Sequence, residues 1–298
     1  HEGGHLIFGL MTGYKFNSFR IFSVILIKQN GKLKIKNISL AGTGGQCLMS
    51  PPELIDGKMP YVLYNLGGVI LNVITSLIFI VIYLISLWKL LSLAMIMSAI
   101  MGFASAVVNG IPMKVGDINN DGYNAVQLGS DKDALKALWV QLKMNGALAE
   151  GIGIREMPEE WFESIDGKND NPMITSIKVF YCNRLMAMHK FEQTKEEIKK
   201  VLESNMVLVG VYRYLLICDY IYCELIDGNI IEAEEFYTKD LQKFMKSMKK
   251  FPAILRTKYT YELLHNKDSK QAEKLRTLFN IMSEKYPYTS DIEAENEL

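Results

Sequence analysis

The sequence predicts a mainly α-helical protein: a polytopic membrane helical core with a small β-hairpin, followed by a soluble α-helical hairpin repeat domain, a solenoid. Three observations predict this fold class. Residues 61–111 contain a single charged residue, Lys89, whereas charges recur every few residues from about 131 onward. An Asn-Gly pair followed by strict alternation predicts the hairpin. From residue 173, pairs of helical segments recur with a spacing of about 38 residues, which is typical of solenoids.

These changes in composition define three expected regions. Residues 1–130 form the membrane core, 131–172 a helical connector, and 173–290 the repeats. The 33 basic and 33 acidic residues balance, so the charge gives no argument for nucleic acid as a partner. The four cysteines lack metal-ligand spacing and predict reduced thiols that face a cytosol-like compartment.

The core is expected to contain three apolar helices. Residues 61–87 and 90–111 are each long enough to span a hydrocarbon layer of ~30 Å, with a tight turn at Trp88-Lys89 between them. Residues 1–13 are the end of another apolar helix, whose upstream part we expect to be missing from the chain. Loop 14–60 is rich in Lys and Arg, which predicts that the loop and everything after residue 112 lie on the cytoplasmic side.

The hairpin prediction rests on one turn. Phe19 to Ile27 is apolar and β-branched, Asn30-Gly31 follows, and Lys32 to Lys36 alternates strictly between lysine and an apolar residue. The alternating lysines are expected to form a solvated strand face. The alternative is that the hairpin edge accepts an extended peptide as an added strand.

The first five residues, His1-Glu2-Gly3-Gly4-His5, predict a metal centre. Positions i and i+4 lie on one face of a helix, so both imidazoles can bind one zinc ion, and Glu2 between them can take a proton from its water. The alternative is a buried core helix of a soluble zinc enzyme. Paired glycines favour the membrane, where helices pack closely.

A third protein ligand is required, and Asp121 is the candidate. It precedes Gly122 just after the last apolar run. The alternative is that Asn119-Asn120-Asp121-Gly122 only forms an Asx-type turn or a helix cap.

Four segments, in this order, resemble motifs of the site-2 protease family, zinc metalloproteases that cut peptide bonds within the membrane. The opening pentapeptide resembles H-E-x-G-H, and Gly44 to Met49 resembles G-G-x-x-x-M. Gly68 to Asn72 resembles G-P-x-x-N, with Val69 in place of proline. Asn109-x-x-Pro112 followed by Asp121-Gly122 resembles N-x-x-P…D-G with a longer spacer. The resemblance covers roughly residues 1–130.

The resemblance implies a zinc-dependent intramembrane endopeptidase in a bacterial cytoplasmic membrane, as a multi-pass protein with its repeats in the cytoplasm. Its substrate would be a membrane protein or a membrane-bound peptide. His1, His5 and Asp121 would hold Zn²⁺, and Glu2 would be the general base. Asn72 would face the cleft and hold the substrate main chain or the oxyanion. Because the spacer is longer, Asp117 remains a substitute for Asp121.

The repeats resemble tetratricopeptide repeats with longer units. The expected helix pairs are 173–188 with 192–202, 206–226 with 230–248, and 253–264 with 269–284. The tail from Asp291 is acidic and expected to fray. The Tyr-rich first helices of the pairs are expected to be core. The alternative is that the concave face of the repeats binds a protein partner, since such faces commonly bind peptides. The alternative function is a non-catalytic membrane scaffold that binds its partner through them.

Overall fold

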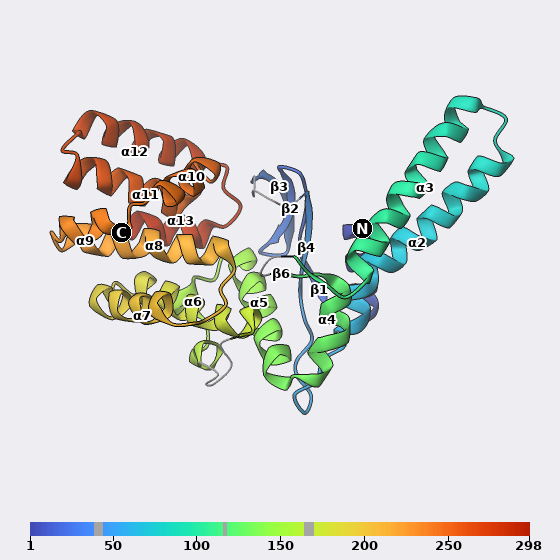
Figure 1. Ribbon diagram of the computed structural model, residues 1–298, viewed down its shortest axis with the longest axis horizontal. Helices are drawn as coiled ribbons and strands as arrows, with labels where there is room; N and C mark the ends of the chain where they lie inside the picture. The colour runs from blue at the N-terminus through green and yellow to red at the C-terminus, as the bar shows by residue number, and fades with distance from the viewer. Residues whose placement is uncertain (39–43, 116–117, 164–169) are drawn as a thin grey trace.

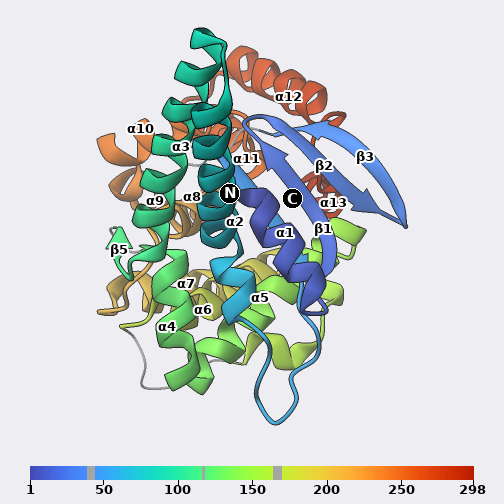
Figure 2. The same ribbon diagram turned by 90° about the vertical axis from the view of Figure 1, so that its right-hand side faces the viewer.

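The computed structural model describes residues 1–38, 44–115, 118–163 and 170–298. A four-stranded antiparallel sheet lies near the middle of the molecule, between a long helical hairpin and a group of shorter helices (Figure 1). The hairpin consists of α2 (Val62–Ile85) and α3 (Lys89–Gly110). The first helix, α1 (Glu2–Met11), packs beside α2 at the end of the hairpin nearer the sheet (Figure 2).

The sheet is larger than the expected small hairpin. Its strands are β1 (Lys15–Ile21), β2 (Val24–Gln29), β3 (Lys32–Asn37) and β4 (Gly45–Ser50), in the order β3-β2-β1-β4. The predicted turn is confirmed: Gln29 pairs with Lys32, and Asn30 and Gly31 have φ of 48° and 74°. The expected single strand from Phe19 to Ile27 is wrong, because Phe22, with φ of 50°, turns the chain between β1 and β2.

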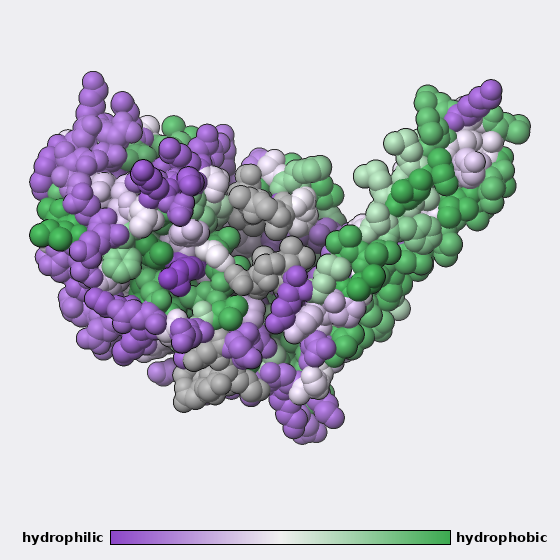
Figure 3. Space-filling model, viewed as in Figure 1, coloured by the Kyte–Doolittle hydropathy of each residue, from purple (hydrophilic) through white to green (hydrophobic). Residues whose placement is uncertain are grey.

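The part of the chain that the structure describes contains two helices long and apolar enough to cross a membrane, α2 and α3. The described residues therefore contain two such helices and not the expected polytopic core. In the most apolar 18-residue stretch of each helix, only 17% of the residues of α2 and 11% of those of α3 are buried. The α2–α3 hairpin projects from the rest of the molecule, and apolar side chains cover most of its visible surface (Figure 3).

Beyond α3, a short ribbon leads to the site. Strands β5 (Lys114–Val115) and β6 (Ile118–Asn119) pair antiparallel, and α4 (Asp121–Gln127) follows directly. The next helix, α5 (Lys132–Glu150), packs against β1, β2 and β4 and against α6. One buried cluster runs from Tyr14 and Met49 through Leu138 to Ile177, so the sheet, the expected connector and the first repeat helix share a core.

The three expected helix pairs are present. The first is α6 (Pro172–Ala187) with α7 (Phe191–Glu203). The second is α8 (Gly210–Ile226) with α9 (Ile230–Phe236) and α10 (Lys239–Ser247). The expected second helix of this pair is interrupted after Phe236, and the Thr238 side chain caps the start of α10. The third is α11 (Pro252–Thr260), extended by a π turn, with α12 (Ser269–Ser283).

The expectation that the tail frays is wrong. Helix α13 (Thr289–Glu297) packs against α11 and α5. Its Glu295 pairs with Arg256, which is only 8% exposed and also binds Asp219. A buried guanidinium requires such partners, and they hold the acidic tail against the repeats.

Candidate metal centre

Three side chains from two distant segments meet at the start of α1. His1 Nε2 lies 3.1 Å from Asp121 Oδ2, and His5 Nε2 lies 3.5 Å from the same oxygen. The two Nε2 atoms are 3.3 Å apart. The structure therefore brings together the three residues predicted as metal ligands, and among the described residues they form a group that could hold a metal ion.

The spacing of these atoms tests whether zinc fits. Bonds of ~2.0–2.2 Å at tetrahedral angles place any two ligand atoms roughly 3.3–3.5 Å apart. The observed separations of 3.1, 3.3 and 3.5 Å all lie within about 0.2 Å of the edges of such a tetrahedron. Two imidazoles and one carboxylate also form a donor set that zinc prefers, with the fourth position left for water or substrate.

The far side of each imidazole is held in place. His5 Nδ1 lies 2.8 Å from the carbonyl oxygen of Tyr64 on α2, which accepts its proton and leaves the Nε2 lone pair directed at the cluster. His1 Nδ1 lies 3.1 Å from the amide nitrogen Nδ2 of Asn72, also on α2, and in this orientation Asn72 donates. A flip of the amide group places Oδ1 there instead, and Oδ1 would accept an Nδ1 proton from His1. These are the outer partners that metal-binding histidines require.

A backbone approach between α1 and α2 positions the histidines. An added Cβ on Gly4 would lie 2.1 Å from the Gly67 carbonyl oxygen, and one on Gly68 would lie 2.6 Å from the His1 ring. Side chains at these positions would therefore push the helices apart. Of the two glycines on α2, only Gly68 was predicted to matter from the sequence, as the first residue of the segment Gly68 to Asn72.

Asn120 and Gly122 position the carboxylate on α4. The Asn120 side chain accepts from Tyr123 N and Met113 N, and it donates to the carbonyl oxygens of Val108 and Ile111. It therefore ties the N-terminus of α4 to the end of α3. A Cβ on Gly122 would lie 2.1 Å from the Gly110 carbonyl oxygen, so only glycine allows this approach. The helix cap considered as an alternative exists, but Asn120 provides it and Asp121 remains available to the histidines.

The remaining predicted residues lie around this cluster. Glu2 is partly buried beside the start of β4, where a Cβ on Gly45 would lie 3.0 Å from its Oε1. Asn72 is 8% exposed, and besides His1 it contacts Ser105 Oγ on α3 at 3.0 Å. Asp117 lies outside the described residues. Tyr64 and Ser105 were not predicted from the sequence, because a backbone acceptor and a single serine leave no pattern.

Comparison with protein-family models, with curated proteins and with solved structures gives no match. The function of the protein is therefore inferred from the residues and the geometry of this site.

Proposed function

We propose that the protein is a zinc-dependent endopeptidase of the membrane, similar to site-2 proteases, that hydrolyses a peptide bond in a membrane protein or a membrane-bound peptide. One observation carries the proposal: three donor atoms from residues 120 positions apart lie at the edge lengths of a tetrahedral zinc site. The oriented Nδ1 atoms of both histidines support it.

The α2–α3 hairpin supports a membrane location. A core helix of a soluble protein is mostly buried. In the described chain, by contrast, few residues in the most apolar stretches of α2 and α3 are buried. Exposed apolar area on this scale would be costly in water and is stable in lipid. The Lys and Arg excess of loop 14–60 favours the cytoplasmic side for the sheet and the repeats.

Each residue has a distinct task in the proposed reaction. His1, His5 and Asp121 would hold the metal ion, which when bound lowers the pKa of water to about 7 and polarises a carbonyl group. Glu2, three residues before His5 on the same side of α1, accepts the proton of the attacking water and returns it to the leaving amine. The Asn72 amide is occupied by His1 and Ser105, so we propose that it orients His1 instead of contacting the substrate.

The substrate segment has to be extended, because the carbonyl groups of a helix are hydrogen-bonded and shielded. Strand β4 forms one edge of the sheet, and its first residue, Gly45, packs against Glu2. An extended segment that adds to this edge would run past the general base. We therefore favour β4 over the β2–β3 hairpin as the strand that holds the substrate open.

Metal content and proteolysis together test the proposal. The purified wild type should contain about one zinc ion per chain, and Glu2→Gln should keep the metal but lose cleavage. Substrates should appear as membrane peptides that differ between cells carrying the wild type and Glu2→Gln. A protein that binds no zinc, or whose Glu2→Gln variant leaves the peptide profile unchanged, would instead be a non-catalytic scaffold.

A further inference from the structure

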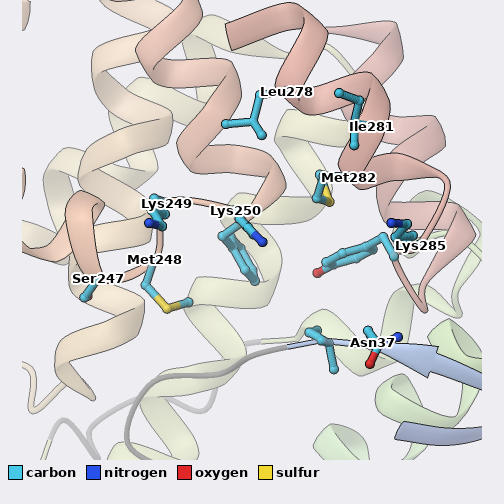
Figure 4. A pocket seen from close by; sticks show the side chains of 12 residues that line it. Asn37, Ser247, Met248, Lys249, Lys250, Leu278, Ile281, Met282 and Lys285 are labelled. Atoms are coloured by element: carbon cyan, nitrogen blue, oxygen red, sulfur yellow. The ribbon is translucent and has the colours of Figure 1, made fainter. Parts of the chain in front are cut away.

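A hollow of about 390 Å³ lies between the end of β3 and the last helices of the repeats, outside the candidate metal centre. Leu278, Ile281 and Met282 of α12 line one side, and Asn37 at the end of β3 lines the opposite side (Figure 4). Met248 between α10 and α11 completes the apolar wall. The volume and the apolar lining fall within the range of sites that bind a ligand side chain.

The rim of this hollow is basic. Lys249, Lys250 and Lys285 line it, and no aspartate or glutamate does. Within the described ranges, no ion pair is formed by these three lysines. An apolar hollow with three unpaired ammonium groups is complementary to a ligand that is both apolar and anionic.

The row of lysines on β3 extends this basic surface. Lys32, Lys34 and Lys36 alternate with apolar residues and therefore lie on one face of the strand. Lys36 Nζ donates to the carbonyl oxygen of Glu284 at 3.2 Å, so the row ends beside Lys285. Among the acidic side chains of the described residues, exposed Glu284 adjoins this surface, Glu150 accepts from the Asn30 backbone N–H, and Asp291 lies near Tyr286 of the lining. Six lysines outnumber these carboxylates, so the surface is positive.

Strand β3 also offers backbone groups. It is an edge of the described sheet and pairs only with β2. The outer edge of such a strand has N–H and C=O groups available to an added strand. Leu33 and Ile35, on the other face of β3, are exposed and can pack against apolar residues of that strand.

We propose that β3 and the hollow beside it form a docking site for an extended acidic peptide segment of a partner protein. The segment pairs with the edge of β3, its carboxylates meet the lysines, and one apolar side chain enters the hollow against Met248 and Met282. This site is independent of the metal centre, and it gives the alternating lysines of the sequence a function.

Peptide binding to the full chain, held in nanodiscs of zwitterionic lipid, tests the proposal. The probe is a fluorescein-labelled peptide of about ten residues, roughly 33 Å when extended, in which glutamate alternates with leucine or valine. The control peptide carries lysine in place of glutamate. An exposed ion pair changes affinity about 1.4- to 5-fold, and a charge reversal replaces an attraction by a repulsion of similar size. Reversing two charges with Lys249→Glu and Lys250→Glu should therefore weaken binding at least about fourfold.

The matched control reverses two exposed lysines at the other end of α12, Lys270→Glu and Lys274→Glu, and should change binding less than about twofold. Ile281→Ser, at a side chain that is 55% exposed and therefore unimportant for folding, should weaken binding through the lost apolar contact. Added salt should weaken the binding of the acidic peptide.

Three results would overturn the proposal. Equal binding to the two double variants would show that Lys249 and Lys250 play no part. Equal binding of the acidic and basic peptides would exclude charge recognition. If anionic lipid in the nanodisc displaces the peptide and protects Lys249, Lys250 and Lys285 from amine labelling, the surface binds a membrane and not a peptide.

Discussion

Replacing Gly4 with alanine should prevent binding of the proposed zinc ion while leaving the fold of the repeats intact. The added Cβ would lie 2.1 Å from the Gly67 carbonyl oxygen and 2.7 Å from Gly68 Cα. An ordinary contact begins at 3.4 Å, so α1 has to move away from α2 by about 1.3 Å. Both contacts are backbone atoms, which cannot rotate out of the way as a side chain does.

That displacement is large compared with the tolerance of a metal centre. Moving α1 by about 1.3 Å would lengthen the separations of 3.1 and 3.5 Å between the histidines and Asp121 to as much as roughly 4.4–4.8 Å. Sites hold their ligands within about 0.5 Å of the productive geometry, and loss of an orienting contact alone costs about 10–100-fold in metal affinity. We expect Gly4→Ala to weaken zinc binding at least about 100-fold.

Gly3→Ala is the matched control, because its Cβ would meet only Leu71 Cδ2 at an ordinary 3.6 Å. Both substitutions raise helix propensity by the same ~1 kcal/mol, so this contribution cancels in the comparison. Metal content and competition with a chelating dye measure the difference, and circular dichroism with size-exclusion chromatography verifies the fold. If Gly4→Ala binds zinc as tightly as Gly3→Ala, the close approach of α1 and α2 does not position the ligands.

Three further predictions concern single side chains. Asn72→Leu should weaken zinc binding about 10–100-fold, measured by dye competition, whereas a substrate-binding role would change only KM or kcat. Asn120→Ala removes four hydrogen bonds and should destabilise the protein by about 1–2 kcal/mol in thermal unfolding, while Asn120→Asp keeps the cap acceptor and should lose less. Burial raises the pKa of Asp291 to about 7, so its neutral form stabilises packed α13, fully below about pH 4 and progressively less as the pH rises through 7. The free energy of opening α13, measured by hydrogen exchange, should therefore be higher in Asp291→Asn than in the wild type at pH 8, by about 1–2 kcal/mol after allowing for partial exposure, and the two proteins should become equal below about pH 4. An equal difference at pH 8 and at pH 3.5 would contradict this reasoning.

Local patterns were sufficient to predict most helices and one turn. The apolar runs at 61–87 and 90–111 are α2 and α3, and Asn30-Gly31 forms the predicted turn because both residues adopt positive φ readily. The break at Phe22 was not predictable, since a phenylalanine with φ of 50° is unusual and the surrounding sheet imposes it. The packing of α13 depends on Arg256, 39 positions away from Glu295, and no local pattern contains that contact.

The three candidate metal ligands could be predicted from the sequence, whereas most groups that hold them in position could not. The i, i+4 spacing of a helix predicts His1 and His5 as ligands, and the position of Asp121 after the last apolar run predicts the third ligand. The supports are backbone groups, such as the Tyr64 carbonyl oxygen, or glycines whose importance lies in the atoms across from them. Gly3 and Gly4 are identical in the sequence, and only the structure reveals that Gly4 alone faces the backbone of α2.

The same backbone contacts connect the metal centre to the α2–α3 hairpin. Helix α1 is set against α2 through Gly4 and Gly67, and α4 is set against the end of α3 through Gly122 and Gly110. The histidines therefore depend on the position of α2, and Asp121 depends on the position of α3. The distance between the two halves of the site is determined by how α2 and α3 pack against each other, which includes the buried Ser76 facing Gly102. If the hairpin lies in a bilayer, as we propose, close packing at small residues such as Gly102 and Ser76 holds these helices together, and the ligand geometry depends on that packing.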